Sequence, residues 1–451
     1  MKRNVLIIIL LSMLSVHESG AQKKWTLMDC ITYAVSNNIQ LQRQRLLTEN
    51  EKVNLLKSKM DMLPNLSFES DGRLGFGRSV NPVTNLITFE QNVSNSYSLS
   101  SNYALFNGFA YLNTVSANKF MLKAGVETEK VATNTLVLNI LSAYHQVLYA
   151  KGIENAAKMQ YELSQKQLFR IQKTVETGRE SLSSQYEMES RSSGDKLAYT
   201  VAINTTSQAI TTLKQILELE PGTEFDIATP DLDNFLITDE IFRIDSIYDI
   251  AAQTLPRLKA INYELMAMEK QVASAKGRVF PRLSVGGAIF TGYYKVFRED
   301  ATIEQAGFWD QMKNNNSQAV YMSLQVPLFS NYTTGRNIKL AKIRLNDTEL
   351  KLELEKNSLY TDIENACLEF NRGKDEYAAA RANFEFNKKS FEVVEKKFES
   401  GLVDVTDYSA ASTTLFRAET EALRTKLQLL LRRISIQFYS TGDYQSMINF
   451  K

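Results

Sequence analysis

Two stretches of this 451-residue chain repeat apolar residues at alternating steps of four and three positions. The first stretch covers about residues 112–177 and contains no proline. Its repeating positions are Leu136, Ile140, Ala143, Val147, Ala150, Glu154, Ala157, Tyr161, Ser164, Leu168, Ile171 and Val175. The second stretch, residues 335–400, has the same series 223 positions later: Leu359, Ile363, Ala366, Phe370, Gly373, Tyr377, Ala380, Phe384, Asn387, Phe391, Val394 and Phe398. This spacing predicts two helices of ~100 Å at 1.5 Å per residue, each packed along other long helices.

Four shorter segments alternate apolar and polar residues with period two, which is typical of strands with one apolar face. The segments expected to be strands are 65–77, 95–106, 282–292 and 318–329. In the first of them, Leu66 and Phe68 share one face, while Ser67 and Glu69 share the other.

The elements follow the same order twice, which indicates a structural duplication. Each repeat contains a helix, two strands, a long helix and a second helix that returns along it. The first repeat is expected at 22–220, with long helices 112–177 and 182–219. The second is expected at 244–441, with long helices 335–400 and 404–440. Residues 221–243 are interpreted as a linker and 442–451 as a C-terminal tail.

Prolines and glycines mark the same points of both repeats. Pro64 and Pro281, 217 positions apart, stop the first helix of each repeat. Gly178 and Gly401, 223 positions apart, end the two long helices. The six additional residues of the second repeat therefore fall in its strand–strand loop, 292–318, which corresponds to 78–93 in the first repeat. Loops tolerate such insertions at little cost.

The start of the first repeat is also readable from its residues. Thr26 is expected to cap the first helix, and Asp29, three residues on, favours its first turn. This helix is expected to run with some interruption to Met62.

Four strands are too few to close a barrel in one chain, because the smallest membrane barrels use about eight. An open sheet edge in lipid would cost several kcal/mol for each unpaired backbone group. Two alternatives remain: a small soluble sheet whose apolar face packs inward, or a barrel shared between chains. The strand lengths suit tilted membrane strands of ~9–11 residues. Three chains would then form a twelve-stranded barrel, apolar outside and polar inside, which continues into a cylinder of long helices.

Residues 1–21 resemble a cleaved secretory signal, with an uncleaved membrane anchor as the alternative. Lys2 and Arg3 precede an apolar run, and small residues end the segment. The residue after the expected cleavage is Gln22 rather than cysteine, so lipid attachment there is not indicated. Beyond residue 21 no apolar run approaches eighteen residues, and no spanning helix is expected.

The remaining composition argues against several other classes of protein. The formal net charge is +1, and this balance gives no indication of nucleic-acid binding. His145 is interpreted as a structural histidine, and Cys30 and Cys367 as buried side chains, with a disulfide between them left open. The sequence shows no metal-spaced Cys/His cluster, phosphate loop or GxSxG motif. We therefore expect no enzyme activity, no cofactor and no metal site.

The sequence resembles the TolC-like outer membrane efflux proteins over nearly the whole mature chain. The resemblance is carried by "TLMDCITYAVSNNIQLQ", "LPNLSF", the "LFNG" strand end, and "FESGLVDVTDYSAASTTLFRAETEALRTKLQLL". It implies a mainly α-helical fold with a β-barrel part, assembled as a homotrimer in the outer membrane with a tunnel across the periplasm. It also implies passive conduction from an inner-membrane transporter through a periplasmic adaptor to the outside, in efflux or type I secretion.

The resemblance implies two functional turns, where a glycine followed by an apolar residue meets the adaptor. The matching residues are Gly178, Arg179 and Glu180 in the first repeat, and Gly401, Leu402 and Val403 in the second. Arg179 departs from the family pattern, so the first turn is expected to contact the adaptor differently.

The resemblance also raises the question of an acidic gate near these turns. Ser184 and Ala410 occupy places where many members have aspartate. Asp404 and Asp407 are the candidate gate residues instead, and the alternative is that both are solvated residues that favour a helix start.

A second function remains open from the residues alone. The chain would then be a periplasmic coiled-coil scaffold with a small soluble β domain and no role in transport. The sequence does not indicate which cargo a duct of this kind would carry, nor which pump it would serve.

Overall fold

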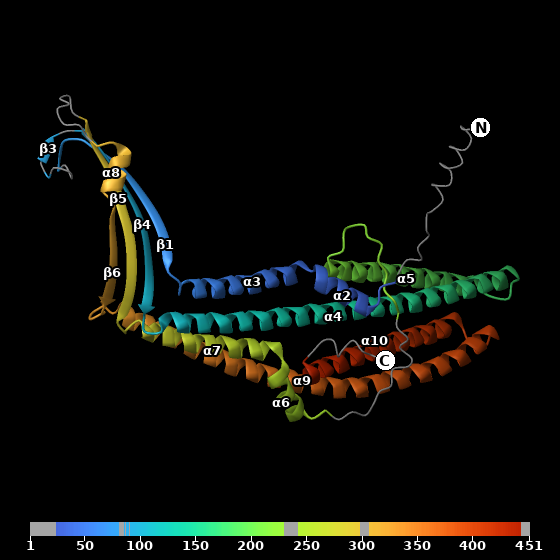
Figure 1. Cartoon of the computed structure of the whole chain (residues 1–451). Helices are drawn as coiled ribbons and strands as arrows, with labels where there is room; N and C mark the ends of the chain where they lie inside the picture. Colours follow the sequence, from blue (N-terminus) through green and yellow to red (C-terminus); the bar gives the residue numbers. More distant parts are fainter. Residues whose placement is uncertain are drawn as a thin grey trace, which may run out of the picture. The chain divides into compact units, whose positions relative to one another are not determined.

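The computed structural model describes residues 24–80, 85, 87–89, 91–229, 242–297 and 306–442 (Figure 1). The chain divides into two compact units, which are described separately. We call Met1–Arg45, Thr128–Leu258 and Glu355–Lys451 the helical unit, and Leu46–Glu127 with Lys259–Leu354 the sheet unit. The expected signal 1–21, residues 230–241 of the linker, parts of both loops and residues 443–451 of the tail lie outside the described residues.

The elements of the two repeats follow one another in the same order. Those of the first repeat are α2 (Leu27–Asn37), α3 (Ile39–Met60), β1 (Asn65–Gly75), β2 (Arg78–Val80), β3 (Ile87–Phe89), β4 (Gln91–Phe106), α4 (Ala110–Glu176) and α5 (Leu182–Leu217). Those of the second are α6 (Ile244–Thr254), α7 (Pro256–Gly277), β5 (Arg282–Phe297), α8 (Phe308–Asn314), β6 (Ser317–Gln325), α9 (Thr333–Glu399) and α10 (Val405–Thr441).

None of the helices in the described ranges has a stretch long and apolar enough to cross a membrane.

The main sheet is fully antiparallel, with strand order β1-β4-β5-β6 (Figure 1). The two strands of the first repeat therefore pair next to the two strands of the second. Within the described residues, β1 and β6 are the edge strands of this sheet. Along both of them almost every residue is exposed.

The strand register sorts the side chains into two chemically different faces. Phe68 pairs with Leu99 and Leu99 with Ile289, so all three lie on one face, which we call the apolar face. Its large exposed residues are Leu66, Phe68, Leu74, Leu99, Tyr103, Ile289, Val320, Met322 and Leu324. The opposite, polar face includes Ser67, Glu69, Asp71, Arg73, Ser94, Ser96, Ser98, Ser100, Asn102, Ser284 and Ser323. The period-two pattern therefore predicted the faces correctly.

Two glycines allow a close backbone approach between the strand ends and the helices of the sheet unit. Gly108 follows β4 in a left-handed conformation with φ +64°, and Gly277 ends α7. A Cβ on Gly108 would lie 2.0 Å from the carbonyl oxygen of Gly277, and a Cβ on Gly277 2.4 Å from that of Gly108. Neither backbone has room for a side chain at this junction.

In the helical unit, the two predicted seams face the interior. Every position of both series is buried or half-buried. A large core cluster joins α2, α4 and α5 to the segment after α5, and its members include Cys30, Ala34, Ile140, Val147, Leu213, Leu217, Phe225 and Ile227. Such contacts are what stabilises very long helices, because an isolated helix gains little from propensity alone.

The first helix of each repeat is broken: the sequence predicted an interruption in the first repeat, but one helix in the second. The predicted cap is present: the Thr26 hydroxyl accepts from the Asp29 backbone N–H at 3.1 Å, and the Asp29 side chain accepts in return from the Thr26 N–H. The chain then becomes extended at Asn38 and restarts as α3. In the second repeat Pro256 forces Leu255 out of the helical conformation, and α7 begins at the proline.

The strands and loops also differ from the prediction. β4 begins at Gln91 and β5 extends to Phe297, because the polar stretch of β4 from Gln91 to Ser94, which lacks clear alternation, continues the pairing with β5. The expected loop 78–93 contains the short hairpin β2–β3, and the expected loop 292–318 contains α8.

In the described part of the chain, Cys30, Cys367 and His145 have structural roles. Cys30 and Cys367 are both buried, as predicted, and both are free, so the disulfide that the sequence left open is absent from the structure. The Nδ1 atom of His145 donates to the Leu141 carbonyl at 2.8 Å, since a carbonyl can only accept. Burial lowers the pKa of His145, so the imidazole is held neutral.

Candidate functional site at the helical turns

The two turns that join the long helices have the same backbone geometry. Gly178 and Gly401 both have φ +71°, a conformation that glycine adopts without steric cost. In the first turn the N–H of Gly178 donates to Val175 at 2.9 Å and that of Arg179 to Thr174 at 2.9 Å. The second turn has the matching pair, from Gly401 to Phe398 at 3.1 Å and from Leu402 to Lys397 at 2.9 Å. This is the Schellman ending, and it satisfies the last carbonyls of α4 and α9.

The helices that leave the turns begin with side-chain caps. The Ser181 hydroxyl accepts from the Ser184 N–H at 3.1 Å at the start of α5. The Asp404 carboxylate accepts from the Asp407 N–H at 2.8 Å at the start of α10. Each connection is thus ordered by its own hydrogen bonds and ends in a short, exposed tip.

The two turns differ in the side chains that they expose. Leu402 is 75% exposed, although a residue at this position of a Schellman ending often packs against its own helix. Val403 is half-buried, and Arg179 and Glu180 are exposed. The second turn therefore presents an apolar surface, and the first presents a charged pair at the matching place.

Behind the turns, the two hairpins pack on a small core of their own. It consists of Ile171 and Met188 from the first hairpin with Phe391, Val405 and Tyr408 from the second. The ring of Tyr408 stacks on Phe398, with centroids 4.5 Å apart. Figure 1 shows the two turns at the same end of the helical unit. The candidate residues of both repeats are thus brought to one region.

A polar layer lies next to this core and connects α4, α5 and α10. The Arg191 guanidinium pairs with Asp195 at 3.1 Å and also donates to the Thr413 hydroxyl. Gln160 donates to Asp195 and to the hydroxyl of Ser412. Asp195 is 8% exposed, and these hydrogen bonds offset the cost of burying its carboxylate. The layer fixes the register of one hairpin against the other.

The Tyr408 hydroxyl is buried without a hydrogen-bond partner among the described residues. Burial is the main cause that raises the pKa of this group, so it stays neutral. Because an unpaired buried hydroxyl costs ~1–3 kcal/mol, Tyr408→Phe is expected to raise the free energy of unfolding by about 1 kcal/mol. Tyr408→Ala is expected to lower it by ~3–5 kcal/mol, because it also leaves a cavity. Urea unfolding followed by circular dichroism measures both, and a loss of stability in Tyr408→Phe would contradict the prediction.

Asp404 and Asp407 are both exposed at the start of α10. One oxygen of Asp404 accepts the hydrogen bond that caps α10. This agrees with the alternative interpretation of Asp404 as a residue that favours a helix start. Their part in a gate stays a prediction. Sequence reasoning missed the Arg191–Asp195 layer, although the i,i+4 spacing of an arginine and an aspartate on one helix was a readable signal.

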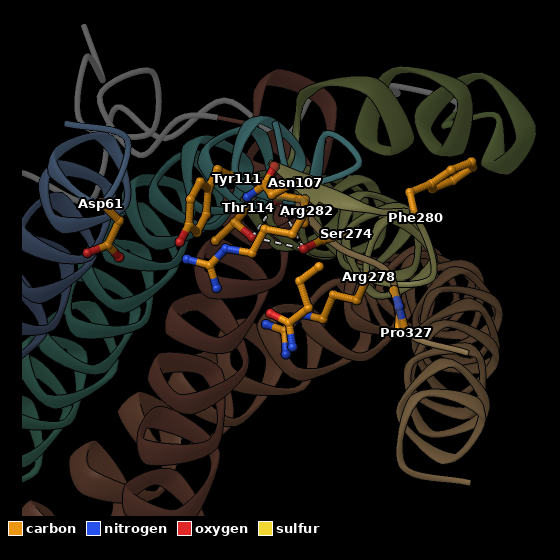
Figure 2. Close-up of a pocket in the computed structure, with 11 residues that line it drawn as sticks. Asp61, Asn107, Tyr111, Thr114, Ser274, Arg278, Phe280, Arg282 and Pro327 are labelled. Carbon is orange, nitrogen blue, oxygen red and sulfur yellow. Dashed lines mark hydrogen bonds between the residues drawn. The ribbon is translucent and has the colours of Figure 1, made fainter. Parts of the chain in front are cut away.

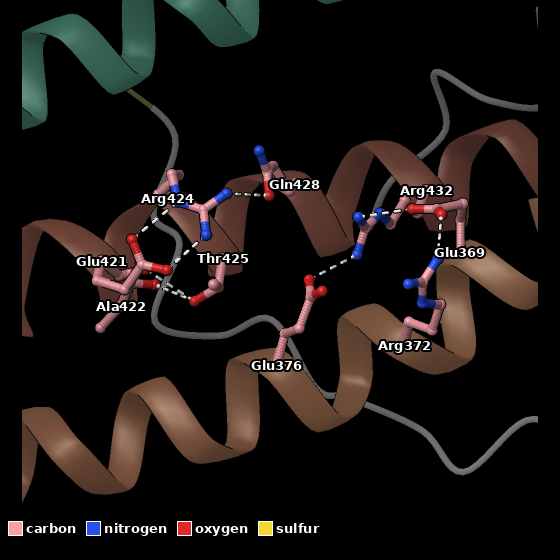
Figure 3. A network of polar contacts seen from close by, with 9 residues as sticks. All are labelled: Glu369, Arg372, Glu376, Glu421, Ala422, Arg424, Thr425, Gln428 and Arg432. Carbon is pink, nitrogen blue, oxygen red and sulfur yellow. Dashed lines mark hydrogen bonds and ion pairs between the residues drawn. The ribbon is translucent and has the colours of Figure 1, made fainter.

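Further along the second hairpin, α9 and α10 are joined by ion pairs (Figure 3). Arg432 of α10 pairs with Glu369 at 2.7 Å and with Glu376 at 3.1 Å, both on α9. Gly373 leaves the room for this arginine, because a Cβ there would lie 2.6 Å from its guanidinium. These ion pairs therefore hold α9 and α10 together at this level of the hairpin.

The sheet unit contains a pocket of about 440 Å³ where its strands meet its helices (Figure 2). Arg278 and Arg282 extend into it, while the Asp61 carboxylate pairs with Lys57 at 2.7 Å. Thr114 and Ser274 are hydrogen-bonded to each other at 2.9 Å on its wall. The lining residues include neither histidine nor cysteine. The two arginines make the pocket basic, and their chemistry favours contact with anions.

Comparisons with known proteins concern the fold as a whole. Residues 247–440 match the family model described as outer membrane efflux protein. The solved structure of CusC is 15% identical, with a TM-score of 0.78 over 92% of this chain and 92% of that one. The Campylobacter jejuni CmeC outer membrane channel is 17% identical, with a TM-score of 0.77 over 93% and 86%. The open state of the Neisseria gonorrhoeae MtrE outer membrane channel is 18% identical, with a TM-score of 0.75 over 92% and 88%. The comparison with curated proteins gives no match.

These findings confirm the predicted fold class, in which long helical hairpins carry a small antiparallel sheet. The family match covers the second repeat, and the shared fold extends over nearly the whole chain. The second repeat is therefore similar to the outer membrane efflux protein family, and the chain as a whole shares the fold of solved outer membrane channels.

Proposed function

We propose that this protein is the outer membrane exit duct of a tripartite efflux or type I secretion system. It conducts its cargo passively, and the energy for transport comes from an inner-membrane transporter. A periplasmic adaptor connects that transporter to the helical turns. The match of residues 247–440 to the outer membrane efflux protein family supports a conducting role without a catalytic one.

The observation that carries the proposal is the open, two-faced sheet. Its apolar face exposes large residues such as Val320 at 86% and Leu66 at 74%. Its edge strands β1 and β6 have unpaired backbone on their outer sides within the described residues. In lipid such edges are too costly to remain open, so each must pair with a strand from another copy.

The strand directions permit this pairing. Since all neighbours in β1-β4-β5-β6 are antiparallel, β6 of one copy meets β1 of the next in antiparallel orientation. Three copies supply twelve strands, within the range of outer membrane barrels. The apolar face then contacts outer membrane lipid and the polar face lines the duct. The long hairpins of the three copies form the periplasmic tunnel.

The turns at Gly178 and Gly401 are the proposed contact with the adaptor. Leu402 is the proposed apolar anchor, because it is exposed on a short, ordered tip. Arg179 and Glu180 offer a polar contact at the matching place of the first repeat. Asp404 and Asp407 follow the second turn and are the proposed acidic gate.

Membrane fractionation separates this proposal from the scaffold alternative. A duct is expected in the outer membrane fraction, to require detergent for extraction, and to migrate as a trimer in crosslinking and light scattering. Deletion of the gene should abolish export of the cargo of its system. A monomer in the soluble periplasmic fraction would contradict the proposal and favour the scaffold.

The adaptor contact has its own test. Leu402→Asp is expected to weaken adaptor binding tenfold or more, because burying a leucine contributes ~2 kcal/mol and ~1.4 kcal/mol corresponds to tenfold. Leu197→Asp is the matched control, since Leu197 is also an exposed leucine, at 65%, but lies within α5. Binding of the purified trimer to the immobilised adaptor is measured for both. An equal loss in the two variants would show that the turn has no special role.

A further inference from the structure

The short helix α8 packs on the apolar face of the sheet. The ring of Phe308 lies 5.2 Å from that of Tyr293 and 6.5 Å from that of Tyr97, edge-on to Tyr97. Tyr97 pairs with Thr291, and both belong to the same face as Leu99 and Ile289. The position of α8 follows from this register: it covers the face that would meet lipid rather than the polar face.

The helix is held in a fixed orientation by the edge of β5. Strand β6 pairs with β5 only as far as Phe290, so beyond that point β5 has a strand neighbour in the described sheet only on its β4 side. The Gln311 carboxamide takes the place of a strand: it accepts from the Tyr294 N–H at 2.9 Å and donates to the Tyr294 carbonyl at 2.9 Å. The Asn315 amide donates to the Gly292 carbonyl at 2.7 Å. Gln311 is 6% exposed, so this joint is shielded from water.

With α8 fixed in this way, its exposed residues include the aromatic Trp309 together with the charged Asp310 and Lys313. Trp309 is 79% exposed, and its ring lies edge-on to Phe308 at 5.2 Å. Lys313 in the same helix and Lys295 on the apolar face add two cationic side chains nearby. A tryptophan beside lysines is the composition found where membranes meet water, because indole is apolar with one polar N–H.

The height of α8 on the sheet matches such a boundary. β5 begins directly after α7, so its Arg282 end is the one next to the helices. Thr291 to Tyr294 lie about ten residues further, which is ~33 Å along a strand. A tilt of ~35–45° reduces this rise to ~25 Å, the height of the apolar band in outer membrane barrels. Figure 1 shows α8 beside the end of the sheet that is farther from the helices.

We propose that α8 is a membrane anchor that binds the outer leaflet, with the Trp309 indole between the lipid headgroups and the acyl chains. The proposal rests on the proposed function, because it takes the apolar face to be the lipid-facing one. It adds an interaction surface that the barrel itself does not require. The occupant is lipid, attracted by the indole and by the two lysines, which favour anionic headgroups.

The chain offers a clean spectroscopic test because it contains two tryptophans. Trp25→Phe leaves Trp309 as the reporter, and it keeps an aromatic ring against Tyr33 and Phe225. The trimer is reconstituted into phosphatidylglycerol vesicles whose acyl chains are brominated either near the headgroup or near the chain end. Trp309 fluorescence is expected to be quenched strongly by the first lipid, weakly by the second, and little by acrylamide in the water.

Two further tryptophan variants distinguish failure of the anchor proposal from failure of the proposed duct function. In a background with Trp25→Phe and Trp309→Phe, Leu99→Trp reports the apolar face and Ser98→Trp the polar face. If Leu99→Trp is quenched by brominated lipid but Trp309 by acrylamide alone, the duct stands and the anchor is overturned. If Leu99→Trp is not quenched either, the proposed function fails and the anchor with it. Gln311→Ala should release α8 from β5 and abolish the quenching of Trp309 by brominated lipid. Quenching of the Leu99→Trp reporter should persist in the same background. Unchanged quenching of Trp309 would overturn the proposed fixation of α8 by Gln311.

Discussion

Gly277→Ala is expected to prevent the sheet unit from reaching its native structure and to remove the protein from the outer membrane. The added Cβ would lie 2.4 Å from the Gly108 carbonyl oxygen and 3.2 Å from the Ala110 backbone nitrogen. Both are backbone atoms, and Gly108 is already in the left-handed region, so neither side can yield cheaply. We expect a loss of at least ~3 kcal/mol in the free energy of unfolding. The measurement is the amount of trimer in the outer membrane and the urea midpoint of the purified protein.

Gly125→Ala is the matched control in the same unit. Gly125 also lies in a helix, α4, but the nearest atoms to its added Cβ are Glu51 Cγ at 3.7 Å and Thr48 Cα at 3.8 Å. These are ordinary contacts, and alanine favours a helix over glycine by up to ~1 kcal/mol. Its trimer level should equal or exceed that of the natural chain. If both variants accumulate equally well, the junction is more tolerant than its geometry indicates.

A covalent clamp between the two hairpins is expected to abolish export. Thr406 of α10 and Glu187 of α5 approach each other at the turns, with their oxygens 3.4 Å apart. Opening the duct requires the hairpins to shift relative to one another, because their turns close its periplasmic end in the proposed assembly. Glu187→Cys with Thr406→Cys, made with Cys30→Ala and Cys367→Ala, can be joined by a short cleavable dithiol linker. Export should stop on crosslinking and recover when the linker is reduced.

A second cysteine pair tests whether movement between the hairpins is the cause. Glu369→Cys with Arg432→Cys joins α9 to α10 within one hairpin, where the natural side chains already form an ion pair at 2.7 Å. Crosslinking this pair should leave export intact, because these two helices move as one body. Export that continues with the Glu187–Thr406 pair fully crosslinked would contradict the gating role of the turns.

The faces of the sheet and the seams of the helices could be predicted because each depends on a local repeat. Leu66 and Phe68 are two residues apart, and their common face follows from strand geometry whatever they pair with. The heptad positions of α4 and α9 are similarly local, and the structure buries or half-buries all of them. The exposed, open sheet edges were also predicted, from the small number of strands.

Other features depend on contacts between distant residues, which one sequence does not reveal. Gly108 was visible in the "LFNG" motif, but its close approach to Gly277 required the tertiary structure. Helix α8 was missed because seven residues are too few to show a period, and its stability comes from Gln311 pairing with β5. The contact and gate roles of the turns remain predictions, since they concern partners rather than the chain itself.

The unpaired outer sides of β1 and β6 have a consequence for inheritance. Every subunit in the proposed ring pairs one edge strand with each neighbour. A mutant chain that is damaged only along β6 can therefore still pair through its β1 with β6 of a wild-type subunit. Such a chain would enter the trimer and inactivate it instead of being excluded from assembly. Mutations at these edges should therefore be dominant when both alleles are expressed, whereas those that abolish folding altogether should be recessive.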